Sequence, residues 1–195
     1  MIELKIGIDL DNTLIKPINN AVDVAAKNLG IKNYPDICDY WFSSLSEEHR
    51  NECMRLFNDP DFMGIKNYRP IEHYSVLNKM MKWKKLGHEI VIITAREEPI
   101  HLVTLELVYI CFHPIKKVLF CNITESKKQL MIDEKLDVWI DDAPHGVETS
   151  CKLGIKTYLI YNERTKKYIP DDLIEGLSVI CVEEVSNIKL EGERV

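Results

Sequence analysis

The chain lacks the features that mark membrane-spanning, disulfide-bonded and zinc-binding proteins. None of its apolar runs approaches the roughly 20 residues that a membrane-spanning helix requires. No two cysteines form a Cys-x-x-Cys pair, so neither a zinc site nor a disulfide framework is expected. The first residues lead directly into a strand-like run and show no signal-peptide pattern. These absences predict a cytoplasmic protein with reduced thiols and no membrane contact.

An excess of basic charge is also missing. The sequence contains 25 lysines and arginines against 31 aspartates and glutamates, a formal net charge of −6. Nucleic-acid polymers and acidic membranes attract basic surfaces, so neither is expected as a partner. A small phosphorylated molecule remains a possible partner, because a metal ion and a few cationic side chains can dominate one cleft. The sequence does not define an oligomeric state.

What the chain does contain is a regular alternation of short apolar runs and amphipathic stretches. The strand-like runs cover residues 4–9, 89–94, 117–121, 138–141, 156–161 and 178–182. Helical patterns cover residues 71–86, 99–112, 125–136 and 143–153. This alternation predicts an α/β fold, a Rossmann-like parallel sheet with helices on both faces. Ligands bind such sheets at the carboxyl ends of the strands, where Asp9, Thr94 and Asp141 are expected to meet.

Residues 15–69 interrupt the alternation. They contain helical patterns at 20–29 and 46–57 but no strand-like run. Ser44 and Glu47 have the spacing of a capping box that would begin the second helix. We therefore predict a small helical cap subdomain at 15–69, inserted after the first strand and lying over the strand ends. The core domain would then comprise residues 1–14 and 70–195. The alternative is that these helices pack on the flank of the sheet.

Acidic side chains stand at the ends of two strand-like runs. Asp9 and Asp11 follow the first run, and Asp141 and Asp142 end a later one. Burying a carboxylate costs several kcal/mol unless a cation or hydrogen bonds compensate it. Carboxylates gathered at one edge therefore predict a metal ion, and hard oxygen ligands suit Mg²⁺ best. The alternative is that these residues merely end strands and cap the helices that follow.

Four motifs, taken in order along the chain, resemble those of the haloacid dehalogenase (HAD) superfamily of phosphohydrolases. They are Asp9-Leu-Asp11-Asn-Thr13, Ile92-Ile-Thr94-Ala-Arg96, a lysine near 127, and Asp141-Asp142. The resemblance covers about 140 residues, and the inserted helices match the position of the superfamily's helical cap. Size, cap position and the run of the motifs are most similar to the 5′(3′)-deoxyribonucleotidase-like group.

The resemblance implies catalytic and metal-binding roles for four aspartates. Asp9 is expected to be the nucleophile that forms an aspartyl-phosphate, and Asp11 the general acid and base. The expected Mg²⁺ ligands are Asp9, Asp11 through its backbone carbonyl, and Asp141. Asp142 is expected to orient the metal-bound waters or the loop.

Phosphate binding is expected from Thr94 and one lysine. The Thr94 hydroxyl and the backbone N–H that follows it can hold a phosphoryl oxygen. Lys127 and Lys128 are adjacent, and helix neighbours point about 100° apart, so only one of them can face the site. We prefer Lys127, because its distance from the next strand is similar to the superfamily's usual spacing. For Arg96 a phosphate contact, a cap contact and a surface position all stay open.

These residues predict a Mg²⁺-dependent phosphomonoesterase that works through an aspartyl-phosphate. Its expected substrate is a nucleoside or deoxynucleoside monophosphate, as for a 5′-nucleotidase. In the cap, Trp41 and Phe42 either stack on the nucleobase or form the cap's own core, and Arg69 is a hinge or a substrate contact. The alternatives are a sugar-phosphate phosphatase or phosphomutase of the same superfamily, and a phospho-aspartate signalling module. Asp-x-Asp on the first strand, followed by an inserted cap, argues against the signalling module.

Overall fold

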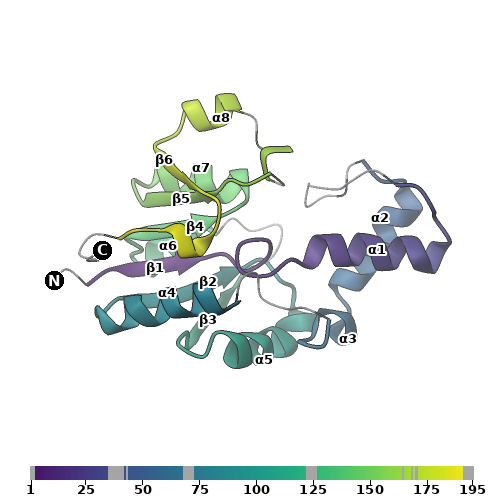
Figure 1. Cartoon of the computed structure of the whole chain (residues 1–195), viewed down its shortest axis with the longest axis horizontal. Helices are drawn as coiled ribbons and strands as arrows, with labels where there is room; N and C mark the ends of the chain where they lie inside the picture. Colours follow the sequence, from purple (N-terminus) through teal and green to yellow (C-terminus); the bar gives the residue numbers. More distant parts are fainter. Residues whose placement is uncertain are drawn as a thin grey trace.

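A single parallel sheet organises the chain (Figure 1). The computed structural model describes residues 3–34, 42, 44–67, 73–121, 127–163, 165–167, 169 and 171–190, and the two candidate cap residues Trp41 and Arg69 lie outside these ranges. The six strands are β1 (Lys5–Ile8), β2 (Glu89–Thr94), β3 (Lys117–Phe120), β4 (Val138–Asp141), β5 (Lys156–Ile160) and β6 (Val179–Val182). They pair in the order β3-β2-β1-β4-β5-β6, and every pairing is parallel.

Helices connect the strands. They are α1 (Pro17–Leu29), α2 (Glu47–Phe57), α3 (Pro60–Met63), α4 (His73–Lys85), α5 (His101–Cys111), α6 (Lys128–Asp133), α7 (Pro144–Lys152) and α8 (Asp171–Glu175). Short 3₁₀ turns form η1 (Glu98–Ile100), η2 (Thr165–Lys167) and η3 (Val185–Asn187). The predicted α/β fold is confirmed, and each predicted strand agrees with the observed one to within one residue at either end. Within the described ranges, no helix is long and apolar enough to cross a bilayer.

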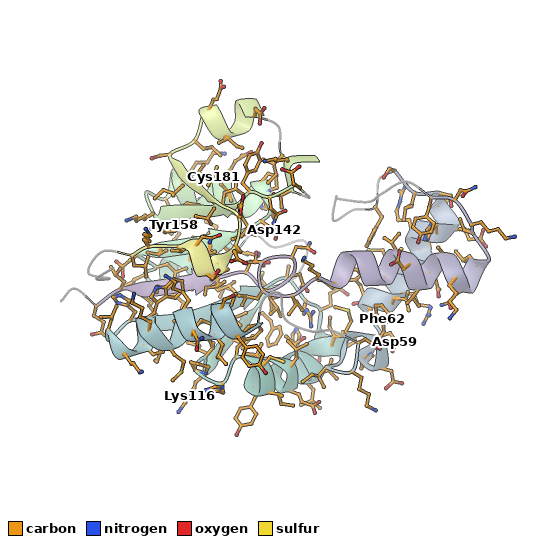
Figure 2. The ribbon with its side chains drawn as sticks, viewed as in Figure 1. Asp59, Phe62, Lys116, Asp142, Tyr158 and Cys181 are labelled. Atoms are coloured by element: carbon orange, nitrogen blue, oxygen red, sulfur yellow. The ribbon has the colours of Figure 1, made fainter. Side chains whose placement is uncertain are left out.

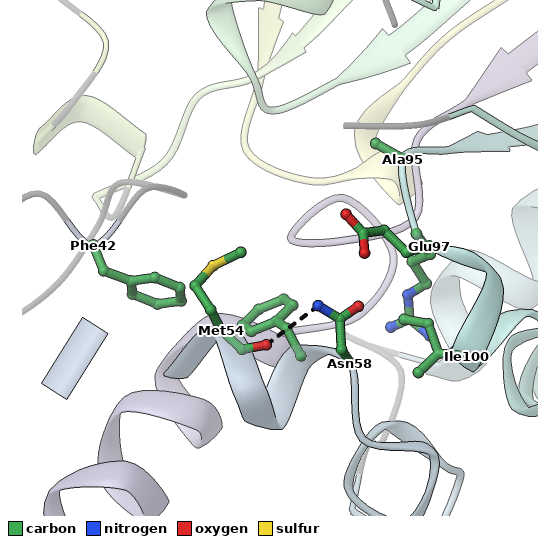
Figure 3. Close-up of a pocket in the computed structure, with 8 residues that line it drawn as sticks. Phe42, Met54, Asn58, Ala95, Glu97 and Ile100 are labelled. Carbon is green, nitrogen blue, oxygen red and sulfur yellow. Dashed lines mark hydrogen bonds between the residues drawn. The ribbon is translucent and has the colours of Figure 1, made fainter. Parts of the chain in front are cut away.

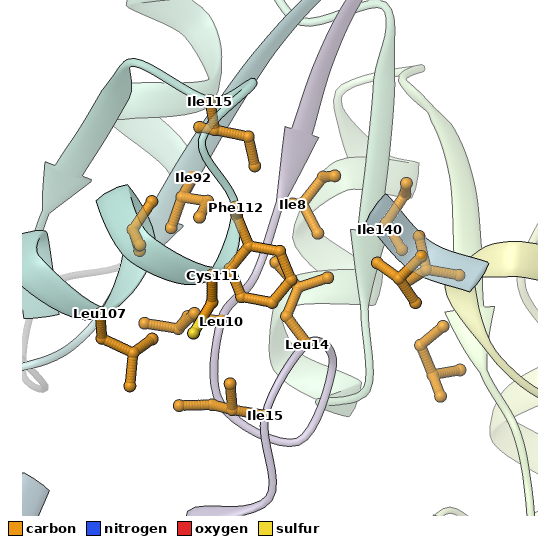
Figure 4. Packing of buried hydrophobic residues seen from close by; sticks show 14 of the residues in the cluster. Ile8, Leu10, Leu14, Ile15, Ile92, Leu107, Cys111, Phe112, Ile115 and Ile140 are labelled. Atoms are coloured by element: carbon orange, nitrogen blue, oxygen red, sulfur yellow. The ribbon is translucent and has the colours of Figure 1, made fainter. Parts of the chain in front are cut away.

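Side chains alternate between the two faces of the sheet, and each face is covered by helices. Ile8, Ile92 and Ile140 point to one face, where they pack in one cluster with Phe112, which directly follows α5 (Figure 4). Trp83 of α4 belongs to the same cluster. The intervening residues of the same strands point to the other face. There Val91, Ile93 and Trp139 pack with Met131 of α6, and Val147 of α7 packs with Leu159. The predicted helices on both faces are thereby confirmed.

Helices α1, α2 and α3 follow β1 in the chain, and α1 and α2 extend beyond the sheet on the side toward which β1 points (Figure 1). His49 of α2 is buried, and its Nε2 lies 3.1 Å from the Val22 carbonyl oxygen of α1. Phe42 packs edge-to-face on Phe57 with ring centroids 5.6 Å apart. The division into a core and a cap of residues 15–69 stays a prediction, because one hydrophobic cluster runs from these helices to the sheet.

One local prediction in this region is corrected, and one helix was not predicted. Ser46, and not Ser44, is the N-cap of α2, and its Oγ accepts a hydrogen bond from the His49 N–H at 3.4 Å. Glu47 is consequently the first residue of the helix and does not complete a capping box. The short helix α3 was not predicted. Asp59 caps it by accepting a 2.9 Å hydrogen bond from the Asp61 N–H, and Phe62 of this helix is buried (Figure 2).

Gly7 of β1 gives a test of sheet packing. A Cβ at this position would lie 2.4 Å from Leu136 Cδ1 and 2.7 Å from Trp139 Cε3, closer than side chains can pack. We expect Gly7→Ala to lower the free energy of unfolding by about 1–3 kcal/mol, the usual cost of overpacking a core. Urea unfolding of the two proteins measures the difference. An unchanged free energy would show that Leu136 and Trp139 can move aside without cost.

Candidate active site

The strand order brings the predicted site residues to one edge of the sheet. The chain builds outward from β1 through β2 to β3, then crosses to β4 on the other side of β1. Ligands bind open parallel sheets at such a reversal, outside the carboxyl ends of the strands. Asp9 directly follows β1 and hydrogen-bonds through its N–H to the Ile140 carbonyl of β4 at 2.9 Å. Asp141 is the last residue of β4 and Thr94 the last of β2.

Three carboxylates form a compact buried group at this edge. Asp9, Asp141 and Asp142 each offer an oxygen, and these oxygens all lie within 4.8 Å of one another. None of the three residues is more than 6% exposed. Asp142, which was expected to orient the metal-bound waters or the loop, is therefore as close a member of this group as the two expected carboxylate ligands. The Asp11 carboxylate is not a member of the group.

Lys127 inserts its ammonium among these carboxylates. Its Nζ donates to Asp9 Oδ1 and lies 3.4 Å from Asp141 Oδ2. It also lies 5.2 Å from the centre of the Trp139 ring, and Trp139 in turn donates its indole N–H to Asp141 Oδ2 at 3.1 Å. Burial alone would lower the pKa of Lys127, but the attraction of Asp141 and Asp9 outweighs it, and the net shift is upward. The neighbouring Lys128 is exposed.

The donor set fits a divalent cation. Burial raises the pKa of Asp9 well above its ordinary value, and repulsion from Asp141, Asp142 and Asp11 adds to this, while Lys127 offsets only part of the shift. One ammonium therefore faces three carboxylates, which leaves an excess of negative charge in a buried place. A cluster of carboxylate oxygens with unbalanced charge suits a hard cation such as Mg²⁺.

Close packing holds the acidic pair of β4 in place. Asp141 Oδ1 accepts a 3.0 Å hydrogen bond from the Ala143 N–H. A Cβ on Gly146 of α7 would lie 1.9 Å from Asp141 Oδ2, so only glycine permits the helix to approach this closely. Thr13 donates its hydroxyl proton to Asp142 Oδ1 at 3.1 Å. Asn12, with φ 64°, supplies the left-handed residue of the turn that brings Thr13 back toward β4.

The Asp11 carboxylate forms a buried ion pair with Arg96. Nε and Nη2 of Arg96 donate to its two oxygens at 3.1 and 2.8 Å. Nη1 of Arg96 donates to the Thr104 hydroxyl at 2.9 Å, and Thr104 donates to the Ile100 carbonyl. Arg96 is 2% exposed, so among the three positions left open by the sequence, the surface position is excluded. Its motif position was noted from the sequence, but nothing in the spacing indicated its partner.

Thr94 has the environment expected of a ligand-binding hydroxyl. Its side chain is fully buried, and its Oγ1 has no hydrogen-bond partner among the residues that the structure describes. A buried hydroxyl without a partner costs free energy, so such a group is an indication of a missing ligand. The neighbouring backbone is already engaged, because the Thr94 carbonyl accepts a 2.9 Å hydrogen bond from the Cys121 N–H.

A slit opens between α2 and the loop that follows β2 (Figure 3). It is lined by Phe42, Met54, Phe57, Asn58, Ala95, Arg96, Glu97 and Ile100. Phe42, one of the two aromatic residues expected either to stack on a substrate or to form cap core, is 1% exposed and packs on Phe57. It belongs to the hydrophobic core in this structure and at the same time forms a wall of the slit.

Comparison with known proteins defines the fold. No protein-family model and no curated protein matches the sequence. Solved structures do match. A haloacid dehalogenase-like hydrolase from Streptococcus pneumoniae is similar with a TM-score of 0.59 and 16% identity, over 87% of this chain and 92% of that one. The chain has the fold of the HAD-like hydrolases.

Two further similar structures contain ligands. CbbY from Rhodobacter sphaeroides, in complex with xylulose-(1,5)bisphosphate, has a TM-score of 0.61 and 13% identity, over 95% of this chain and 96% of that one. A HAD family hydrolase from Deinococcus radiodurans, with bound phosphate and sodium, has a TM-score of 0.62 and 11% identity, over 92% of this chain and 90% of that one. At these identities the likeness concerns the HAD-like fold alone.

The contribution of the buried Arg96–Asp11 ion pair to stability can be compared with the contribution of an exposed ion pair. We expect Arg96→Met to lower the free energy of unfolding by about 3–5 kcal/mol, because it leaves the Asp11 carboxylate buried without its partner. Arg55 is a matched control: it pairs with Glu52 at 2.8 Å but is 55% exposed, so Arg55→Met is expected to cost less than about 1 kcal/mol. Denaturant unfolding measures both.

The double variant Arg96→Met/Asp11→Asn keeps this test informative if the single variant does not fold. We expect it to recover part of the loss, since the uncompensated charge is gone. Equal losses for Arg96→Met and Arg55→Met would show that the buried pair contributes no more than a surface pair.

The group of Asp9, Asp141 and Asp142 predicts stabilisation by Mg²⁺. Since the pKa of Asp9 is raised in the folded state, the metal-free protein loses stability as the pH rises from the ordinary aspartate value through the raised one. A cation that binds the ionised carboxylates reverses this loss. At 100 times its dissociation constant we expect it to stabilise the fold by about 2.7 kcal/mol. Thermal unfolding with Mg²⁺ or EDTA, at pH 5 and pH 8, measures the effect, which grows with pH.

Asp141→Asn is expected to abolish most of this stabilisation. Asp133→Asn is the control, because Asp133 is an exposed aspartate of α6 outside the acidic group. Stabilisation by Mg²⁺ that survives Asp141→Asn would place the cation elsewhere.

Proposed function

We propose that the chain is a Mg²⁺-dependent phosphomonoesterase in which Asp9 is the nucleophile. The observation that carries this proposal is the position of Lys127, whose ammonium contacts both Asp9 and Asp141 inside a buried group of carboxylates. Asp9, Asp141 and the backbone carbonyl of Asp11 would hold the cation, and the nearby Asp142 carboxylate would hold it directly or through water. When bound, Mg²⁺ supplies positive charge that offsets the repulsion between a phosphate ester and a carboxylate.

The reaction proceeds in two displacements. In the first, an Asp9 oxygen attacks phosphorus, the bond from phosphorus to the ester oxygen breaks, and Asp11 gives that oxygen a proton. In the second, water attacks the aspartyl-phosphate, Asp11 takes a proton from the water, and Asp9 is released together with inorganic phosphate. In the structure both oxygens of the Asp11 carboxylate accept hydrogen bonds from Arg96. Its carboxyl group must therefore turn from Arg96 toward the ester oxygen when it donates the proton.

Lys127 and Thr94 would bind the phosphoryl group between the two displacements. Lys127 already contacts Asp9, the proposed nucleophile. Its positive charge therefore lies where negative charge passes from Asp9 to the phosphoryl group during the attack. The Thr94 hydroxyl, which has no hydrogen-bond partner in the described part of the chain, provides a donor at the neighbouring strand end, and a phosphoryl oxygen would satisfy it. The helices of residues 15–69 would act as the cap that limits access of water to this site.

For the substrate we propose a nucleoside or deoxynucleoside monophosphate. Its support is the set of apolar side chains beside Arg96, namely Phe42, Met54 and Phe57, because apolar side chains suit a nucleobase more than a hydroxyl-rich sugar. A sugar phosphate is the second candidate, because CbbY, one of the similar structures, contains xylulose-(1,5)bisphosphate. A phosphatase and a phosphomutase would share all the residues named above, and release of free phosphate distinguishes them.

Phosphate release from a panel of nucleoside monophosphates, sugar phosphates and p-nitrophenyl phosphate tests the proposal. We expect activity with Mg²⁺ that is lost in EDTA, and Asp9→Asn to abolish it because no nucleophile remains. Lys127→Met should lower kcat by about 10²–10³-fold, as the loss of a transition-state donor does. Lys128→Met is the matched control and should retain kcat, because Lys128 is exposed. Turnover by Asp9→Asn, or equal losses from both lysine variants, would contradict the assigned roles.

A further inference from the structure

Helix α5 leads into the edge strand β3 and lies on the outer side of the molecule (Figure 1). The fold uses one side of this helix. On that side Leu107, Val108 and Cys111 belong to the hydrophobic core, and the Thr104 hydroxyl accepts a hydrogen bond from Arg96. A helix on the surface of a protein normally has polar side chains on its other side, where it meets water.

The outward side of α5 is apolar instead. Leu102 and Tyr109 are 79% and 77% exposed, and Leu105 and Ile110 are exposed as well. Residues three and four positions apart are neighbours on a helix, so these four side chains form one continuous surface, which we call the α5 patch. Glu106 is the one aspartate, glutamate, lysine or arginine among the eleven residues of the helix. Helices that are apolar on all sides are usually buried on all sides, so the α5 patch predicts a partner that covers it.

The size of the α5 patch suits a protein–protein interface. Its four side chains together expose on the order of 400 Å², comparable to the largest apolar patch that a monomeric protein usually shows. A standard interface buries about 800 Å² on each partner, a little more than half of it apolar. The patch therefore supplies most of the apolar area that one subunit of a stable dimer contributes.

Charges of opposite sign stand at the two ends of α5. Glu97 and Glu98 precede the helix, and Glu98 is exposed. His113 and Lys116 follow it and are both exposed, and the Lys116 side chain extends outward from the loop after α5 (Figure 2). When a second α5 lies antiparallel on the first, the acidic end of each copy meets the basic end of the other. The surface is thus complementary to itself, as the contact about a two-fold axis requires.

We propose that the α5 patch is the interface of a homodimer, in which α5 packs antiparallel on α5 of a second copy of this chain. Leu102 of one copy then lies near Tyr109 of the partner subunit, and Glu98 lies near Lys116 of the partner subunit. An anionic membrane is a poorer occupant of the patch, because Glu98 and Glu106 would repel it. Dimerisation through this surface does not require the proposed phosphatase activity.

Sedimentation velocity of the whole chain over a range of protein concentrations tests the interface. We expect the wild-type protein to form a dimer and Leu105→Glu to raise the Kd of the dimer by about 10–100-fold, because it buries a charge in an apolar contact. Ile132→Glu is the matched control, since Ile132 of α6 is 44% exposed against 43% for Leu105 but lies outside the α5 patch. It should leave the Kd unchanged. Far-UV circular dichroism verifies that both variants are folded.

Charge reversal tests the antiparallel arrangement. We expect Glu98→Lys and Lys116→Glu each to raise the Kd by about 2–30-fold, because each copy loses one exposed ion pair to its partner. The double variant Glu98→Lys/Lys116→Glu should return to the wild-type Kd, since the two charges are exchanged and still opposite.

Three results would overturn the proposed dimer. They are a wild-type protein that is monomeric at every concentration, a dimer that Leu105→Glu and Ile132→Glu weaken equally, and a double charge reversal that fails to restore association. In the first case, co-sedimentation of the monomer with vesicles that contain anionic lipid would show that a membrane occupies the α5 patch.

Discussion

The meeting of several carboxylates in a buried place is the constraint on which the rest of the site depends. Asp9, Asp141 and Asp142 approach within 4.8 Å of one another where β1 and β4 end side by side. Each neighbouring feature reduces the cost of that arrangement. Lys127 supplies charge, the Trp139 indole and the Thr13 hydroxyl supply donors, and the missing side chain of Gly146 supplies space. These groups compensate only part of the negative charge of the carboxylates. The charge that remains suits a divalent cation, so the arrangement favours metal binding.

The sheet and the place of the site were predictable from the sequence because they depend on local patterns. Apolar runs of four to six residues define the strands, and acidic residues directly after such runs must lie at the carboxyl edge of a parallel sheet. The partners of individual side chains were not predictable. Arg96 pairs with Asp11, and Thr13 bonds to Asp142, because the tertiary fold brings together segments that are 85 and 129 residues apart in the chain. No spacing rule covers such contacts.

The helices between β1 and β2 also show what the sequence could predict and what it could not. Helical periodicity predicted α1 and α2, but the four residues of α3 are too few to show a period. For Phe42 the sequence could not distinguish a residue that packs in the cap's core from one that contacts the substrate, because both roles require an aromatic side chain near the strand ends. The structure shows that the two roles overlap, since the ring is buried among apolar neighbours and still forms a wall of the slit. The HAD-like fold is shared by many proteins, and the chemistry of this one depends on such local residues.

The position of β1 in the middle of the sheet has a consequence for how the protein matures during synthesis. β1 is synthesised before its sheet neighbour β4, and 118 residues separate Asp9 from Lys127. A nascent chain therefore carries Asp9 and Asp11 without their buried partners until the segments that contain Arg96 and Lys127 have been made. The group of three carboxylates cannot form in a nascent chain that ends before β4, because Asp141 and Asp142 reach Asp9 only when β4 pairs with β1.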